Sequence, residues 1–249
     1  MTTLADLLYV MYFAAVGPLI DYVFFWPAFH RRSEVDLAKT RTSAWAWTIG
    51  SSWLLVAVGA GIWVWNGRSW SEFGFIVPEG WRLWTSIAVI LLAAVYYGYA
   101  VITLARSGEE RTKLREQFGT LNEVDAVLPH TRREMYWFGG VSLTAGFCEE
   151  FLFRGYFIWF FAPWIGWWGA AVLSLLIFAG WHAYQGWNGV LRVGIVGGIY
   201  TLVLAIFNSL WPAIALHVLV DLANGMMAWL VLREGKLTSE IGKRISVDQ

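Results

Sequence analysis

The stretch GYFIWFFAPWIGWWGAAVLSLLIFAGWHAYQGWNGVL, residues 155–191, decides the fold class of this chain. It contains no Asp, Glu, Lys or Arg, and His182 is its only histidine. A helix needs about 20 apolar residues to cross the core of a bilayer. The stretch is therefore long enough for two crossings, and Pro163 followed by Gly166 indicates where the chain turns.

Further apolar runs of similar length lie on both sides of this stretch. Residues 44–65 and 83–105 carry no charge, and the run 193–220 turns near Asn208–Pro212. The run 4–29 is interrupted only by two Asp residues. We therefore expect an all-α, polytopic membrane helix bundle of about seven transmembrane helices, with six to eight as the limits. The expected spans are roughly 4–29, 44–65, 83–105, 134–160, 164–186, 190–208 and 211–232.

The composition agrees with a membrane protein and argues against nucleic acid as a partner. Hydrophobic residues make up 58% of the chain and charged residues 14%, well below the share usual in soluble domains. The 18 Trp and 10 Tyr residues are typical of side chains that collect at membrane–water boundaries. The formal net charge is zero, so no basic surface for nucleic acid is expected. We predict one integral membrane domain over 1–249: N-terminal spans and a polar connector over 1–128, motif-bearing helices over 129–232, and a cytoplasmic tail over 233–249.

The distribution of positive residues predicts an orientation. Lys and Arg number four in the expected loop 30–43, six in the connector 106–133 and four after Leu232, against two between the second and third spans. Because cytoplasmic loops are rich in Lys and Arg, the N-terminus should lie outside and the C-terminus in the cytoplasm. The early part of the connector should form a surface helix, which Pro129 ends. The short chain without a targeting signal favours a prokaryotic plasma membrane.

A few charged or histidine side chains fall inside the expected spans. A charge at bilayer depth costs a few kcal/mol, so such residues are functional candidates. These candidates are Glu149, Glu150 and Arg154 in the fourth span, His182 in the fifth, Arg192 in the sixth, and His217 and Asp221 in the seventh.

Their spacing predicts two local pairs. Glu150 and Arg154 are four residues apart and share one helix face, whereas Glu149 points about 100° away and is free to meet another neighbour. His217 and Asp221 also share a face. Two readings stay open beside a catalytic one: the pairs can simply fix helices together, or buried Glu and His can relay protons in a transporter. Asp6, in the first span, is expected to make an interhelical hydrogen bond.

Three motifs in this order resemble the CPBP family of intramembrane proteases, which includes the CAAX prenyl endopeptidases and bacterial proteins linked to bacteriocin processing and immunity. Glu149-Glu150-Phe-Leu-Phe-Arg154 reads as E-E-x-x-x-R. Phe178-Ala-Gly-Trp-His182 reads as F-x-x-x-H, and His217-Val-Leu-Val-Asp221 as H-x-x-x-D/N. The resemblance covers roughly 129–225, a little over a third of the chain.

The resemblance implies a glutamate-dependent endopeptidase acting on a protein or peptide at the membrane, without a cofactor. Glu149, aided by His182, would activate water, and His217 with Asp221 would stabilise the oxyanion. Glu150 and Arg154 would hold the site in shape. The family often has Asn at the last motif position, and a carboxylate such as Asp221 donates a hydrogen bond only when protonated. Asp221 is therefore either neutral or limited to orienting His217.

Two alternatives to this mechanism follow from the same residues. Glu149, His182 and His217 form a His₂Glu set of the kind that binds catalytic zinc, although the H-E-x-x-H signature is absent. A non-catalytic immunity or scaffold protein with the same fold is the rival from another class. Cys148, the single cysteine, is interpreted as a small packing residue rather than a nucleophile.

Overall fold

The computed structural model describes residues 2–118 and 126–247, and within these ranges every regular element is a helix. The elements are α1 (Leu4–Met11), η1 (Tyr12–Val16), α2 (Gly17–Ile20), η2 (Asp21–Phe25), α3 (Trp26–Trp65), α4 (Trp70–Phe73), α5 (Gly80–Arg106), α6 (Gly108–Phe118), α8 (Arg132–Glu149), η3 (Glu150–Phe157), α9 (Ile158–Trp181), η4 (Ala183–Gln185), α10 (Gly186–Phe207) and α11 (Leu210–Val247).

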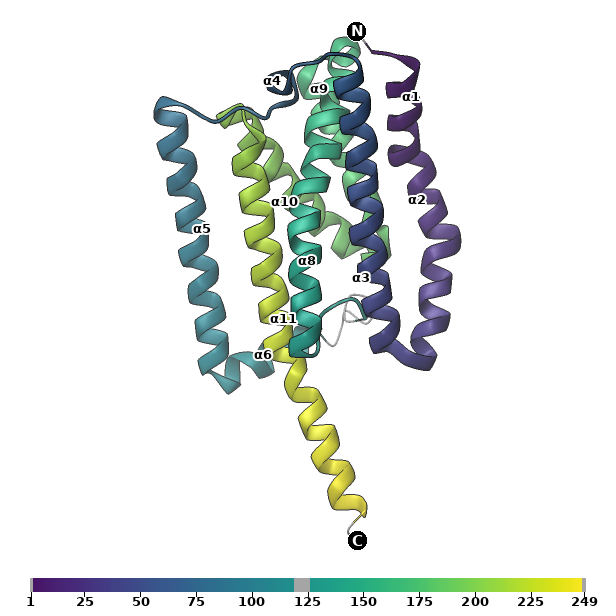
Figure 1. The fold of residues 1–249 in the computed structure, drawn as a ribbon. Coiled ribbons are helices and arrows are strands. Elements are labelled where there is room, and N and C mark those ends of the chain that lie inside the picture. The colour runs from purple at the N-terminus through teal and green to yellow at the C-terminus, as the bar shows by residue number, and fades with distance from the viewer. Residues whose placement is uncertain (1, 119–125, 248–249) are drawn as a thin grey trace.

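The bundle has the helices that a polytopic membrane protein needs. Among the described residues, six helices are long and apolar enough to cross a membrane. One of them, Arg132–Trp181, has 50 residues and contains a sharp bend at Gly166, where φ is +71°. This bent helix therefore contains two of the expected segments, and the all-α polytopic bundle is confirmed (Figure 1), with six candidate membrane helices among the described residues, at the lower limit of the predicted six to eight.

The bend lies at Gly166 because glycine adopts a positive φ without steric cost. Pro163, which the sequence also marked, lies inside α9. Measured from the bend, Glu149 comes 17 residues earlier and His182 comes 16 residues later, so the two side chains reach nearly the same depth. The length after the bend, 15 residues from 167 to 181, gives a helix of only about 22 Å, shorter than a bilayer core of about 30 Å.

The chain consequently turns inside the bundle. The 3₁₀ turn η4 joins α9 to α10 between the two ends of the bundle, and α10 runs obliquely back toward the end that α9 came from (Figure 1). Asn208, in the left-handed conformation with φ 53°, ends α10, and α11 begins at Leu210. This second turn lies within the predicted region Asn208–Pro212.

The loop expected over 30–43 is helical, and that prediction was wrong. The first membrane helix extends to Ser33 and the second starts at Asp36, where a single residue departs from helical geometry. The Asp36 carboxylate accepts a hydrogen bond from the Lys39 backbone N at 3.0 Å, as a helix-capping side chain does. Residues 28–49 contain no Gly or Pro, so nothing in the polar segment interrupts the two helices beyond this kink.

The surface helix expected in the connector is present as α6, and residues 119–125 of that segment lie outside the described residues. Lys113 bridges Glu109 at 2.7 Å and Glu110 at 3.0 Å on its exposed face. In Figure 1, α6 and the bend within α3 lie at the end of the bundle from which the C-terminal helix extends, and the N-terminus lies at the other. The segments rich in Lys and Arg thus share one end.

A buried polar network anchors the N-terminal helix to η3. The Asp6 carboxylate, which is fully buried, accepts two hydrogen bonds of 2.7 Å from Arg68 and one from the Tyr156 hydroxyl. The Arg68 guanidinium also lies 4.3 Å from the centre of the Trp159 ring. Asp6 therefore makes the expected interhelical contact. Because all eight residues of η3 are buried, this network helps to fix the segment that carries Glu150.

Candidate active site

The two adjacent glutamates lie where the helix changes its winding. Glu149 is the last residue of α8, and Glu150 is the first of η3, an eight-residue π-helix. Such wide turns are rare and occur frequently at functional sites. Regular α-helical geometry was expected here, so the π-helix was not predicted from the sequence.

A buried ion pair between Glu150 and Arg154 forms the inner part of the site. Arg154 Nη1 lies 3.3 Å from Glu150 Oε1, and both side chains are almost fully buried. Arg154 Nη2 donates to the Gly197 carbonyl oxygen at 2.9 Å, and the guanidinium lies 4.2 Å from the centre of the Phe178 ring. A buried ion pair is tolerated only with such additional partners, because desolvation of both charges is costly.

His217 connects the buried Glu150–Arg154 ion pair to the partly exposed carboxylates of Glu149 and Asp221. Its Nδ1 lies 2.9 Å from Glu150 Oε1, while its Nε2 lies 3.6 Å from Glu149 Oε2 and 3.7 Å from Asp221 Oδ2. The imidazole is also stacked on Tyr200, with ring centres 4.7 Å apart. Glu149 was expected to meet a neighbour different from that of Glu150, but both carboxylates meet the same ring through its two nitrogens.

The carboxylates of the site differ in their exposure. The side chains of Glu149 and Asp221 are 28% and 33% exposed, whereas that of Glu150 is fully buried. A partly exposed carboxylate, that of Glu149, therefore lies next to an imidazole whose orientation is fixed by a buried carboxylate, that of Glu150. This arrangement suits proton transfer to and from a bound water or substrate.

His182 belongs to the same region but is not joined to the acids. It caps the C-terminus of α9, and its Nδ1 lies 2.9 Å from the Phe178 carbonyl oxygen. Among the described residues, no hydrogen bond or ion pair links His182 to Glu149 or His217. The structure thus brings Glu149, Glu150, Arg154, His217 and Asp221 into one connected cluster, with His182 beside it.

Two glycines that the sequence analysis did not select make the cluster possible. A Cβ on Gly146 would lie 2.4 Å from Val218 Cγ2 and 2.9 Å from Val218 N, so only glycine allows α8 and α11 to approach this closely. A Cβ on Gly197 would lie 2.7 Å from Arg154 Nη2. Small residues are typical of helix contacts in membranes, and this was the available signal.

The sequence raised a metal site and a cysteine nucleophile as alternatives at this site. Within the described part of the chain, no group of three His, Cys, Asp or Glu residues is arranged to hold a metal ion. Cys148 is fully buried in the aromatic core, as expected of a packing residue.

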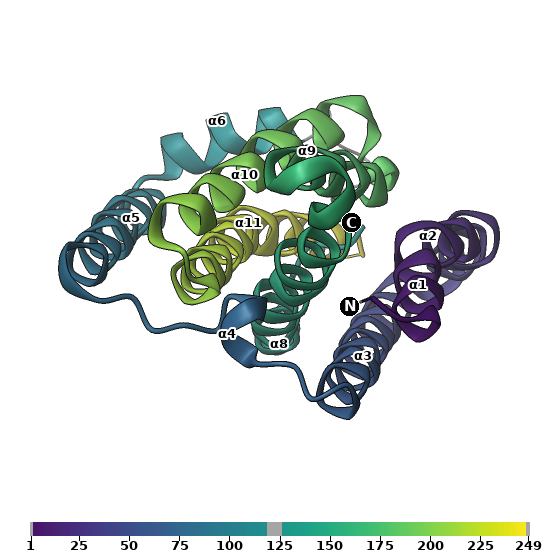
Figure 2. The same ribbon diagram turned by 90° about the horizontal axis from the view of Figure 1, so that it is seen from above.

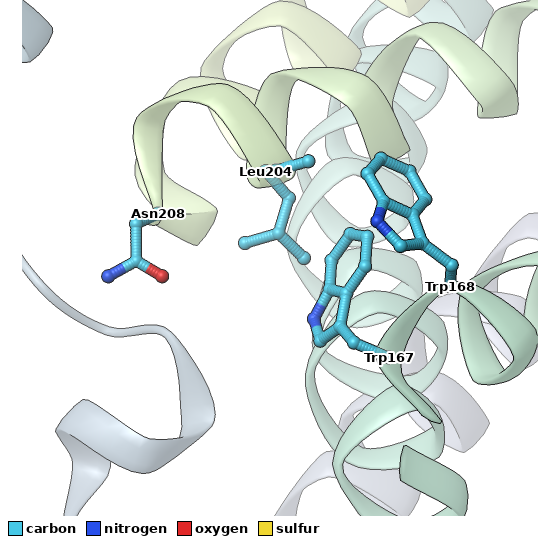
Figure 3. Close-up of a pocket in the computed structure, with 5 residues that line it drawn as sticks. Trp167, Trp168, Leu204 and Asn208 are labelled. Carbon is cyan, nitrogen blue, oxygen red and sulfur yellow. The ribbon is translucent and has the colours of Figure 1, made fainter. Parts of the chain in front are cut away.

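A hollow of about 320 Å³ between α9 and α10 lies apart from the acids and is lined by Trp167, Trp168, Leu204, Ala205 and Asn208 (Figure 3). None of these side chains is acidic, basic or histidine, so this hollow lacks the acid–base groups that the cluster contains.

The helices of the cluster pack around α8 at the centre of the bundle. Seen from above, α8 and α11 lie side by side, α9 and α10 cover them on one side, and α5 stands at the periphery (Figure 2). The site is thus formed by the C-terminal helices, and the N-terminal helices α1 to α3 border it.

Comparison with known proteins finds a family match in the same C-terminal helices that form the site. Residues 131–223 match the family model described as type II CAAX prenyl endopeptidase Rce1-like. No curated protein and no solved structure matches the chain. The matched residues contain all three motifs and every residue of the cluster. The match covers 93 of the 249 residues, and it supports a relation of this part of the membrane chain to the CPBP and CAAX protease-like family, which is a family of proteases.

Proposed function

We propose that this protein is an intramembrane endopeptidase that hydrolyses a peptide bond of a membrane-associated protein or peptide. The observation that carries the proposal is the pairing of a partly exposed carboxylate, Glu149, with the oriented imidazole of His217. The family match supports the class of reaction.

In the proposed reaction Glu149 acts as the general base. Its carboxylate takes a proton from a water molecule, whose oxygen attacks the carbonyl carbon of the scissile bond while the carbonyl electron pair moves onto oxygen. The tetrahedral intermediate then collapses, the C–N bond breaks, and the proton held by Glu149 passes to the leaving nitrogen. One water is consumed and the base is regenerated, so no oxidant or cofactor is needed.

His217 and Asp221 are proposed to assist at the oxyanion. The Nδ1 of His217 is occupied by Glu150, so Nε2 is the ring nitrogen that faces the accessible side. When Nε2 carries a proton, it can donate to the oxyanion. We assign Asp221, 3.7 Å from this nitrogen, to orienting the ring, because an ionised carboxylate cannot donate a hydrogen bond.

His182 and the buried Glu150–Arg154 pair have supporting roles in the proposed reaction. His182 lies at nearly the same depth as Glu149 and is suited to position the attacking water rather than to contact the base directly. Glu150 and Arg154 hold His217 and η3 in place. An enclosed site of low dielectric makes hydrogen bonds to a developing negative charge worth several kcal/mol.

The proposed setting is the plasma membrane, with the N-terminus outside and the C-terminus in the cytoplasm. The end of the bundle rich in Lys and Arg would then face the cytoplasm. A peptide near that surface, or in the membrane beside it, is the proposed partner.

Cleavage by purified protein in liposomes, screened against a library of membrane-tethered peptides, tests the proposal. Glu149→Gln should reduce the rate by roughly 10²- to 10⁴-fold, the usual contribution of a general base. Glu110→Gln, which changes an exposed glutamate on α6, is the matched control and should leave the rate unchanged. Activity should also survive treatment with a zinc chelator.

Other results would favour the alternatives. Cleavage that persists in Glu149→Gln would refute the role of this base. Activity lost with a chelator and restored by Zn²⁺ would favour a zinc protease. A biological phenotype fully complemented by Glu149→Gln, without any detectable cleavage, would favour a non-catalytic immunity or scaffold protein.

A further inference from the structure

Helix α10 contains no residue of the three motifs, yet one of its faces contacts the cluster of charged residues. Gly197, Tyr200 and Thr201 share this face, because they are three and four residues apart. The Gly197 carbonyl oxygen and the Thr201 hydroxyl both accept hydrogen bonds from Arg154, at 2.9 Å and 3.5 Å. Tyr200 is the largest of the three side chains, and the proposed reaction has so far given it no role.

The Tyr200 ring covers one face of the His217 imidazole. The ring centres are 4.7 Å apart, and the two planes differ by 23°. The contacts of His217 with Glu149, Glu150 and Asp221 all reach its two nitrogens, at the edge of the ring. These contacts restrain the tilt of the imidazole only weakly, because the last side-chain torsion of histidine has a broad energy minimum. The stacked phenol ring restrains that tilt.

Tyr200 is itself held in place by three helices. Only 3% of the residue is exposed. It belongs to an apolar cluster of α10 and α11, against which residues of α5 pack. The buried members of the cluster are Tyr200, Val203, Phe207, Ala213 and Leu216, and the residues of α5 are Val89, Ile90 and Ala93. The ring is therefore a fixed surface on which the imidazole rests.

The stack also suits the form of His217 that the proposed reaction needs. The Glu150 carboxylate, paired with the Arg154 cation, accepts the proton of His217 Nδ1, so a second proton on Nε2 makes the imidazole a cation. The face of an aromatic ring attracts a cation that lies within about 6 Å of its centre. Tyr200 therefore stabilises the form of His217 that can donate to the oxyanion.

The Tyr200 hydroxyl has a different standing from the ring. It is buried, and it makes no hydrogen bond to any residue that the structure describes. A buried polar group without a partner lowers stability. The contact with His217 thus belongs to the ring, and the ring can be tested separately from the hydroxyl.

We propose that Tyr200 is a positioning residue, whose ring holds the His217 imidazole with Nε2 toward Glu149 and Asp221 and stabilises its positive charge. The inference rests on the proposed endopeptidase function. Tyr200 acts through His217, forms no bond to the substrate, and takes no part in proton transfer.

The experiment compares Tyr200→Leu and Tyr200→Phe with the wild type in the liposome cleavage assay, using a peptide that the wild type cleaves. Tyr200→Leu removes the ring and should lower kcat roughly 10-fold, since a displacement of about 1 Å at a reacting group can cost roughly 10²-fold. KM should stay constant, because a side chain that is 3% exposed does not reach the substrate. Tyr200→Phe keeps the ring, so kcat should be unchanged and the thermal midpoint should stay constant or rise.

Phe207→Leu is the matched control for the loss of a buried ring. Phe207 is 4% exposed and lies on the same helix and in the same apolar cluster as Tyr200, and within the described ranges it makes no ring contact with His217. Its thermal midpoint should fall as in Tyr200→Leu, whereas its kcat should not change. If Tyr200→Leu folds poorly, Tyr200→Met fills the space with a flexible side chain and should show the same loss of kcat.

Three results would overturn the inference alone, provided that Glu149→Gln is inactive. The first is a wild-type kcat in Tyr200→Leu and Tyr200→Met, and the second is an equal loss of kcat in Phe207→Leu. The third is a loss of kcat in Tyr200→Phe, which would assign the role to the hydroxyl. Absence of cleavage by the wild type would refute the proposed function, and with it the role of Tyr200.

Discussion

Gly146→Ala tests whether the close contact of α8 and α11 creates the site. The added Cβ would lie 2.9 Å from the backbone N of Val218 and 3.2 Å from its Cα, and a change of rotamer cannot move these atoms. Restoring an ordinary contact of 3.4 Å to that nitrogen requires the helices to separate by about 0.5 Å. Because His217 directly precedes Val218, its 2.9 Å hydrogen bond to Glu150 should lengthen by a similar amount.

Gly146→Ala should lower both the stability and the activity of the protein. Overpacking of this kind costs about 1–3 kcal/mol, which the gain of about 1 kcal/mol from replacing glycine by alanine in a helix partly offsets. A displacement of about 1 Å at reacting groups can cost 10²-fold in rate, so a shift of half that size should reduce the cleavage rate roughly 10-fold.

Gly139→Ala is the control for this prediction, since it lies on the same helix and faces the same partner. Its Cβ would meet only Leu222 Cδ2, at 3.8 Å, which is an ordinary contact. The thermal midpoint in detergent and kcat/KM in liposomes should both fall for Gly146→Ala and stay constant or rise for Gly139→Ala. Identical behaviour of the two variants would refute the argument that helix proximity at Gly146 positions His217.

Two further predictions concern the buried charges. Glu150→Gln should destabilise the protein by about 3–5 kcal/mol because it leaves the Arg154 charge buried without its partner, whereas Glu149→Gln, at an accessible position, should cost far less. Thermal unfolding of both variants in the same detergent checks this, and equal losses would contradict it. Asp6→Asn and Arg68→Gln should each lower the thermal midpoint, and the double variant should lose clearly less than the two single losses together, since both remove the same ion pair. Additive losses would show that the pair contributes no coupling energy.

The sequence alone determined the features that depend on distances along one helix. Apolar runs of about 20 residues predict membrane helices, because backbone polar groups in lipid must be satisfied within the helix. The pairs Glu150–Arg154 and His217–Asp221 follow from four-residue spacing, which brings side chains together on a helix surface. The motifs also predicted the family, which the match over residues 131–223 supports.

Only the tertiary structure decided how the helices meet. The turn at Gly166 sets Glu149 and His182 at similar depths, and the contact at Gly146 brings both glutamates to one imidazole. The segment 30–43 is helical apart from the break at Asp36, because it contains no Gly or Pro, although its polarity suggested a loop. Spacing within a helix is fixed by its pitch and rise, whereas contacts between helices depend on the shapes of side chains far apart in sequence. The local pairs were therefore predictable, and the joint placement of Glu149 and Glu150 at the two nitrogens of His217 was not.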